Sequence, residues 1–103
     1  MITVQELKTW MDSNIEIQLV DVRETDELSI CNIGGENIPM SKLAHQPQLL
    51  RKDVPVVLHC KSGTRSGKLA IYMEQTHKLK NLHSLEGGII AWAEHIDPSL
   101  STY

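Results

Sequence analysis

The segment Val54–Lys68 has the sequence VPVVLHCKSGTRSGK, which passes from an apolar run through a basic loop that contains glycine into a helical pattern. The apolar run is rich in β-branched residues, as is typical of a parallel strand that is covered on both faces. From Leu69 onward, apolar residues recur at helical spacing. The segment therefore predicts a strand over 54–60 and a helix over 65–78, with Cys60 at their junction.

Helical and strand-like patterns alternate along the rest of the chain. Thr3 and Glu6 have the spacing of a capping box, which favours a helix that begins at residue 4. The other expected elements are a strand within 15–22, a short helix over 24–28, a brief strand that ends at Pro39, a helix over 42–51 that Pro47 shortens or splits, a strand over 82–85 and a helix over 89–96. Such alternation is typical of an α/β sandwich.

Composition limits the function classes. The 103 residues, 41% of them apolar, suit a single domain over 1–103 with one core. The net charge of −3 and the absence of a lysine- or arginine-rich cluster argue against nucleic-acid binding. No apolar leader segment or 18-residue apolar run is present, which favours a cytoplasmic protein without a membrane span. Two distant cysteines and scattered histidines predict free thiols, no metal site and no cofactor.

Cys60 is the candidate nucleophile. The backbone N–H groups at the start of the following helix are expected to point at its sulfur. Lys61 and Arg65 add positive charge beside it. Both effects favour the thiolate over the thiol, so we expect the pKa of Cys60 to be lowered. His59 precedes it directly, but successive strand side chains point to opposite faces, so its ring should face away from the sulfur.

Four segments in order resemble the rhodanese sulfurtransferases. They are LVDVRE at 19–24, NIGGENIP at 32–39, CKSGTR at 60–65 and LEGG at 85–88 with Trp92 after it. One departure is that Cys31 and Asn32 stand where the family commonly has Gly-His. The resemblance implies a three-layer rhodanese-like fold whose central, mostly parallel sheet has five strands flanked by helices. It also implies transfer of a sulfane sulfur from thiosulfate, polysulfide or a protein persulfide, through a persulfide on Cys60, to a thiophilic acceptor.

The resemblance carries roles to individual residues. Cys60 is the catalytic residue, and the active-site loop around it consists of Lys61, Ser62, Gly63, Thr64, Arg65 and Ser66. We expect Arg65 to hold the loop or the anionic end of the donor, and Lys61 to attract that donor. Asp21 and Arg23 are interpreted as a buried ion pair that supports the loop. For Cys31, both a half-buried apolar role and a resolving thiol that pairs with Cys60 remain open.

Two other functions compete with sulfur transfer. The order His59, Cys60, Arg65, Ser66 resembles the signature of cysteine-dependent phosphatases and arsenate reductases. Those enzymes place five residues between cysteine and arginine, whereas four stand here, which makes the loop tighter than a tetrahedral phosphate requires. The second competitor is a catalytically idle binding or regulatory module with the same fold. The resemblance is strongest to rhodanese domains joined to adenylyltransferases, which implies a ubiquitin-like sulfur carrier or an adenylyltransferase as the protein partner.

Overall fold

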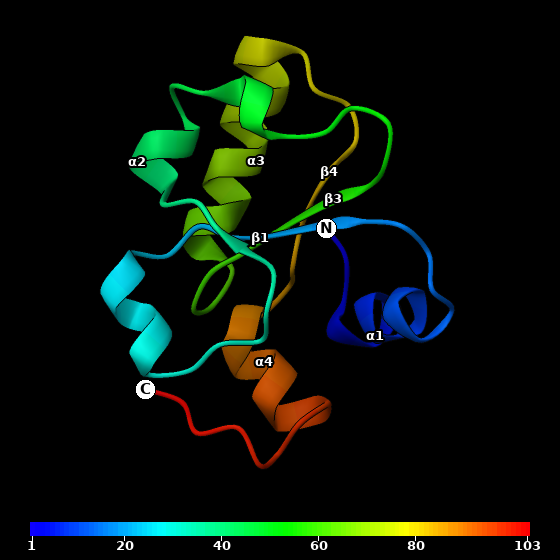
Figure 1. Cartoon of the computed structure of the whole chain (residues 1–103), viewed down its shortest axis with the longest axis vertical. Helices are drawn as coiled ribbons and strands as arrows, with labels where there is room; N and C mark the ends of the chain where they lie inside the picture. The colour runs from blue at the N-terminus through cyan, green and yellow to red at the C-terminus, as the bar shows by residue number, and fades with distance from the viewer.

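A parallel sheet of four strands forms the centre of the computed structural model, which describes residues 1–103 (Figure 1). The strands are β1 (Gln18–Asp21), β2 (Glu36–Asn37), β3 (Val56–His59) and β4 (Leu82–Ser84). Their order is β2-β1-β3-β4, and all neighbours run parallel. Parallel neighbours require crossover connections, and helices supply them here. The expected α/β architecture with a parallel sheet is therefore confirmed.

The expected fifth strand is wrong. Beyond the four strands, the one further pairing is an isolated parallel bridge between Ile2 and Leu85. Thr3 follows at once as the cap of the first helix, and its side chain and that of Glu6 form the predicted capping box. Because the first helix begins at Val4, two residues after the bridge, the ladder cannot extend in that direction.

Two helices cover each face of the sheet (Figure 1). Helices α2 (Met40–Leu43) and α3 (Thr64–His77) pack on one face, while α1 (Val4–Asp12) and α4 (Gly88–His95) pack on the other. Two 3-10 turns, η1 (Thr25–Ser29) and η2 (Pro47–Leu49), complete the fold. The helix expected over 42–51 is thus split into α2 and η2, with Pro47 opening the second piece because it cannot continue the first.

Strand β3 separates the two halves of the core. All four of its residues are buried. Val56 and Leu58 belong to the apolar cluster on the side of α2 and α3, whereas Val57 belongs to the cluster on the side of α1 and α4. This alternation places the next odd and even positions, His59 and Cys60, on opposite faces of the sheet.

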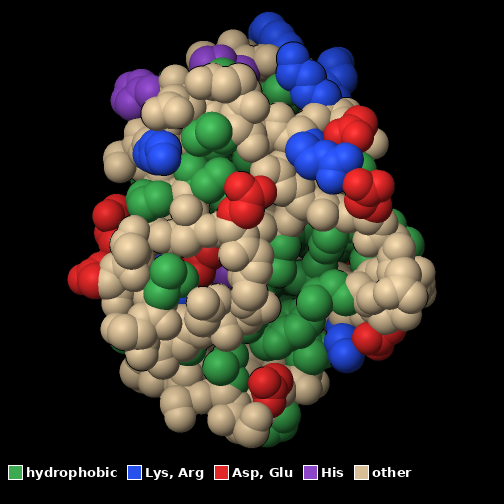
Figure 2. Space-filling view, in the orientation of Figure 1, with side chains coloured by type: hydrophobic (Ala, Val, Ile, Leu, Met, Phe, Trp, Pro, Cys, Tyr) green, Lys and Arg blue, Asp and Glu red, His purple; other side chains and the backbone are tan.

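Helices α1 and α4 cover their face of the sheet only in part. A hollow of about 540 Å³ lies beside α1, lined in part by Met11, Ile17, Leu19 and Ile33. Figure 2 shows it as an apolar depression on the visible surface. No helix of this protein combines the length and hydrophobicity needed to cross a membrane.

Candidate active site

The carboxyl ends of three neighbouring strands meet at one edge of the sheet. Asp21 ends β1, Cys60 follows β3 and Ser84 ends β4. In open parallel sheets, this edge is where ligands bind, because the loops that leave the strands converge there. The arrangement places Cys60 between a charged group on one side and a hydroxyl group on the other.

The Cys60 thiol lies in a cradle of hydrogen-bond donors. Its Sγ accepts hydrogen bonds from the backbone N–H groups of Gly63, at 3.2 Å, and Ser66, at 3.4 Å. The Ser66 hydroxyl lies 3.5 Å from the same sulfur and 2.7 Å from the hydroxyl of Ser84. Cys60 itself is only 1% exposed. The sulfur is therefore held inside the loop, surrounded by groups that can stabilise negative charge.

These donors set the protonation of the thiol. Burial alone raises the pKa of Cys60, because it disfavours the charged thiolate. Hydrogen bonds from the Ser66 side chain and from the backbone of Ser66, Gly63 and Ser62 outweigh burial, so the pKa lies below its ordinary value. The pKa of Cys60 is thus lowered, as expected from the sequence, and uncharged hydrogen-bond donors contribute most to this lowering.

Helix α4 holds the backbone of the loop from below. The N–H groups of Ile89 and Ile90 donate to the carbonyl oxygens of Cys60, at 2.9 Å, and Lys61, at 3.1 Å. A Cβ atom on Gly88 would lie 2.5 Å from the Lys61 oxygen and 2.6 Å from the Cys60 oxygen. Only glycine permits this approach, which explains why the sequence has glycine where α4 begins. Gly63 caps α3 with a positive φ of 98°, which turns its N–H toward the sulfur.

Both cations of the loop contact groups within the chain. The Arg65 guanidinium forms two hydrogen bonds to the carboxylate of Glu27, at 2.7 and 3.0 Å. These bonds hold the pKa of Glu27 at about 2, so its carboxylate stays charged near neutral pH. The Lys61 ammonium lies 4.6 Å from the centre of the Tyr103 ring, a cation–π contact. The donor-binding roles expected of Lys61 and Arg65 stay predictions.

Asp21 and Arg23 form the expected buried ion pair. Their closest contact is 2.7 Å, and both side chains are almost completely buried. Burial tends to lower the pKa of Arg23, but its hydrogen bonds to Asp21 and Tyr103 raise it overall. Arg23 also donates to the carbonyl oxygen of Cys31, at 2.7 Å. The pair therefore supports the segment around Cys31 and η1, and through Glu27 of η1 it is connected to the active-site loop.

His59 is enclosed on the face of the sheet opposite to Cys60. It is 0% exposed, and neither ring nitrogen has a hydrogen-bond partner within the chain. Burial lowers its pKa to about 4, so the ring is neutral near pH 7. Its neighbour in the adjacent strand is Asp21. The strand alternation thus separates the ring from the sulfur, in agreement with the sequence interpretation.

The remaining predicted residues have different surroundings. Ser62 and Thr64 are exposed, and their hydroxyl groups form no hydrogen bond within the chain, so they are free to meet a ligand. Cys31 is a buried free thiol, 3.6 Å from a nitrogen of Arg23. Its burial exceeds the half-buried state expected for it, and a resolving role stays a prediction. No group of three or more metal-ligating side chains comes together anywhere.

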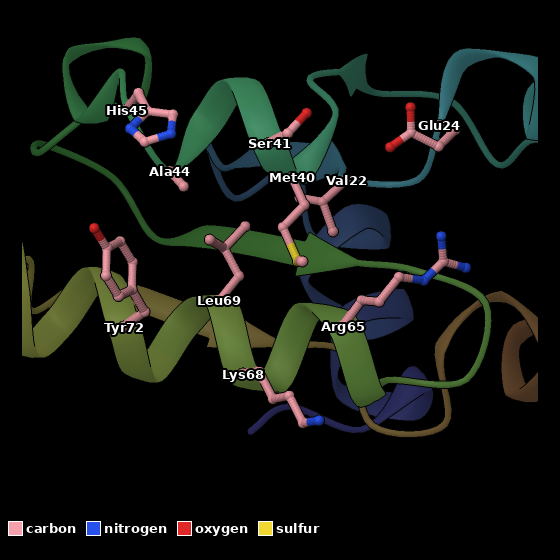
Figure 3. Close-up of a pocket in the computed structure, with 10 residues that line it drawn as sticks. All are labelled: Val22, Glu24, Met40, Ser41, Ala44, His45, Arg65, Lys68, Leu69 and Tyr72. Carbon is pink, nitrogen blue, oxygen red and sulfur yellow. The ribbon is translucent and has the colours of Figure 1, made fainter.

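A groove of about 360 Å³ lies beside the loop, between α2 and α3 (Figure 3). Arg65 and Glu24 stand at one end of it, and His45 stands at the other. Lys68 also lines the groove, but its side chain points away from the centre in this view. Cys60 is not part of the lining, so the groove runs next to the thiol and not over it.

Three contributors escaped the sequence analysis: Glu27, Ser84 and Tyr103. Glu27 binds Arg65 across 38 positions, and Tyr103 binds Arg23 across 80. No local pattern pairs residues at such separations. Ser84 offered a weak signal, because a polar residue near the end of a buried parallel strand lies at the edge where ligands bind.

The fold and the site together define a class of protein: an α/β domain whose reactive cysteine lies at the junction of a strand and a helix. A model of the rhodanese-like domain matches residues 3–95, and the chain belongs to that family. The resemblance in the sequence is thereby confirmed.

Comparison with individual proteins supports the same family assignment. The chain is 34% identical over 105 residues to the probable adenylyltransferase/sulfurtransferase MoeZ of Mycobacterium tuberculosis and 31% identical over 112 residues to the adenylyltransferase and sulfurtransferase MOCS3 of Aedes aegypti. Each match covers 99% of this chain but 26% of the relative, so the chain spans about a quarter of their length.

Solved structures share the fold over most of the chain. A rhodanese-related protein from Thermoplasma volcanium superposes with a TM-score of 0.80 at 29% identity, covering 92% of this chain and 91% of that one. A rhodanese-like domain protein from Staphylococcus aureus gives 0.79 at 28% identity, covering 99% and 96%. Here the chain matches proteins of nearly its own size.

Proposed function

We propose that this protein is a sulfurtransferase that carries a sulfane sulfur on Cys60. The observation that supports this most directly is the cradle around Sγ, in which two backbone N–H groups and the Ser66 hydroxyl surround one sulfur atom. Such donors stabilise a thiolate before the reaction and a persulfide after it, because each carries one negative charge on a sulfur atom. The names of the two curated relatives include the same activity.

The reaction is a double displacement. The Cys60 thiolate attacks the outer sulfur of a donor, a bond forms between the two sulfurs, and the donor's own sulfur bond breaks with the electron pair leaving on the donor remnant. In the second half, an acceptor nucleophile attacks the outer sulfur of the persulfide, and Cys60 leaves as a thiolate. The donors considered are thiosulfate, polysulfide and persulfides, and the acceptors are cyanide in vitro and thiols or a protein in the cell.

The partner and location belong to the same proposal. MoeZ and MOCS3 are named as adenylyltransferases as well as sulfurtransferases. We therefore propose a ubiquitin-like sulfur carrier, or the adenylyltransferase that activates it, as the protein that meets this site. The proposed location is the cytoplasm, a reducing compartment in which thiols stay free, and both cysteines of this chain are unpaired.

Intact-mass measurement tests the proposal. The protein is incubated with thiosulfate, polysulfide or a small persulfide, beside Cys60→Ser and Cys31→Ser variants. The expected result is a gain of about 32 Da on the unmodified chain and on Cys31→Ser, absent from Cys60→Ser and removed by cyanide with release of thiocyanate. No gain with any donor would refute sulfur transfer and leave the idle module, while cleavage of an aryl phosphate would favour the phosphatase.

A further inference from the structure

Arg65, one of the two cations of the active-site loop, is not free to receive an anion. Both terminal nitrogens of Arg65 donate to Glu27, and Lys61 stands against the ring of Tyr103. Only 17% of the Glu27 side chain is exposed, compared with 35% of Arg65, so the carboxylate is the more enclosed partner of the pair. An incoming donor would have to break this two-pronged ion pair before Arg65 could bind it.

Tyr103 keeps Glu27 in that position. Its hydroxyl donates to Glu27 Oε1 at 2.7 Å and accepts from a terminal nitrogen of Arg23 at 2.7 Å. Figure 1 shows how the segment after α4 returns to lie beside η1, the turn that contains Glu27. Glu27 also accepts from the backbone N–H of Glu24 at 2.9 Å. Three separate groups therefore hold the carboxylate, and it cannot simply swing away from Arg65.

The charges around the site then nearly cancel. Arg65 is compensated by Glu27, and Arg23 is compensated by Asp21, which leaves Lys61 as the cation of this cluster without a carboxylate partner. A sulfur oxyanion such as thiosulfate brings two negative charges to a thiolate and to the adjacent Glu27. A persulfide brings at most one. The electrostatic penalty is thus larger for the oxyanion.

We propose that Glu27 is a specificity-determining residue, which disfavours sulfur oxyanions as donors and selects persulfides by holding Arg65 away from the incoming donor. This inference rests on the sulfurtransferase function proposed above and names its donor class. In the selected step, the Cys60 thiolate attacks the outer sulfur of R–S–SH, the S–S bond of the donor breaks, and the products are the Cys60 persulfide, Cys–S–SH, and the thiolate R–S⁻. Atoms and charge balance, and no external oxidant or reductant is needed.

The test compares two donors on three proteins. The rate constant for formation of the Cys60 persulfide is measured by intact mass, with thiosulfate and with the persulfide of N-acetylcysteine methyl ester, whose body is uncharged. The proteins are the unmodified chain, Glu27→Gln, and Asp26→Asn as the matched control. Asp26 lies in the same turn and is exposed, and its side chain pairs with no cation.

Release of Arg65 from its ion pair with residue 27 should mainly increase the rate of reaction with the dianion thiosulfate. Glu27→Gln is expected to raise the rate constant with thiosulfate about tenfold, and that with the persulfide by no more than about threefold, since the Coulomb energy scales with the donor's charge. Asp26→Asn should leave the ratio of the two donors unchanged. If Glu27→Gln folds, as judged by circular dichroism, and also leaves this ratio unchanged, the selection by Glu27 is overturned.

A second measurement needs no variant. If Arg65 stays paired with Glu27, Lys61 is the one cation of this cluster that can attract thiosulfate, and its attraction is opposed by the thiolate. The rate constant with the unmodified chain should therefore change little as ionic strength increases from about 20 to about 200 mM, because little net attraction remains for salt to screen. A steep fall would show that a strong net positive charge, more than Lys61 alone provides, attracts the donor, and it would overturn the inference even if Glu27→Gln failed to fold. Failure of every donor to modify Cys60 would instead refute the sulfurtransferase itself, so the two failures are distinguishable.

Discussion

Replacement of Arg23 by methionine should strongly destabilise the fold. Methionine has a similar length but leaves Asp21 as a buried carboxylate without its partner, and breaking a buried ion pair in this way costs about 3–5 kcal/mol. The change also removes the donor to the Cys31 carbonyl oxygen and to the Tyr103 hydroxyl. Since a domain of this size is stable by about 5–15 kcal/mol, the variant should lose a large part of its free energy of unfolding.

Urea denaturation followed by circular dichroism measures this loss. With a slope of about 1.5 kcal/mol per molar urea, the midpoint should fall by about 2 M or more. Arg51→Met is the matched control, because Arg51 also contacts two carboxylates, those of Glu16 and Asp53, but on the exposed surface. Its midpoint should hardly move, since exposed ion pairs are screened by water and salt.

The double variant Asp21→Leu with Arg23→Met separates charge from packing. It removes the unpaired carboxylate, so it should recover part of the stability that Arg23→Met loses. If Arg23→Met and Arg51→Met lowered the midpoint equally, burial of the Asp21–Arg23 pair would contribute nothing special to the stability of the fold.

Three further outcomes follow from the site. Ser66→Ala should shift the pH profile of Cys60 alkylation to higher pH, because the lost hydroxyl helps to lower the pKa of the thiol; an unshifted profile would contradict the cradle argument. Gly88→Ala should abolish persulfide formation on Cys60, measured by intact mass, since its Cβ would displace the loop carbonyls. His59 is neutral when folded, with a pKa of about 4 against about 6.5 when unfolded, so stability should fall by up to about 3 kcal/mol as pH drops from 6.5 to 4. His59→Phe should remove that part of the acid sensitivity in urea titrations at both pH values.

Local patterns predicted the elements that local interactions create. The capping box of Thr3 and Glu6 involves groups three residues apart, and it forms as expected. The strand that precedes Cys60 was predicted from its apolar run, because a strand buried on both faces consists mainly of apolar residues. Pro47 separates the two helical pieces, because proline has no backbone N–H to continue the first. Each of these signals lies within a few residues of the structure that it predicts.

The number of strands could not be predicted in this way. Strand β2 is two residues long, and no fifth strand forms, since Ile2 and Leu85 make only a single isolated bridge. Whether a residue pairs at the margin of a sheet depends on the neighbour that reaches it, which sequence periodicity does not record. The resemblance supplied the family's five-stranded sheet, but this chain enters α1 too early to extend the outermost ladder.

The positions of Lys61 and Arg65 in the sequence do not reveal which groups lower the pKa of Cys60. Lys61 and Arg65 stand beside Cys60 in the sequence, so charge suggested that they activate the thiol. In the fold, the largest favourable effects on its pKa come from uncharged donors on Ser66, Gly63 and Ser62. Arg65 is held instead by a carboxylate 38 positions away.

This separation has a chemical consequence. Because the cradle can keep the sulfur anionic without a free guanidinium, the pairing of Arg65 can change while the thiolate persists. Glu27→Gln should therefore alter the preference between donors while the pH profile of Cys60 alkylation changes little, whereas Ser66→Ala should alter that profile for every donor alike. Activation of the nucleophile and selection of the donor would then be two properties of one loop, carried by different atoms.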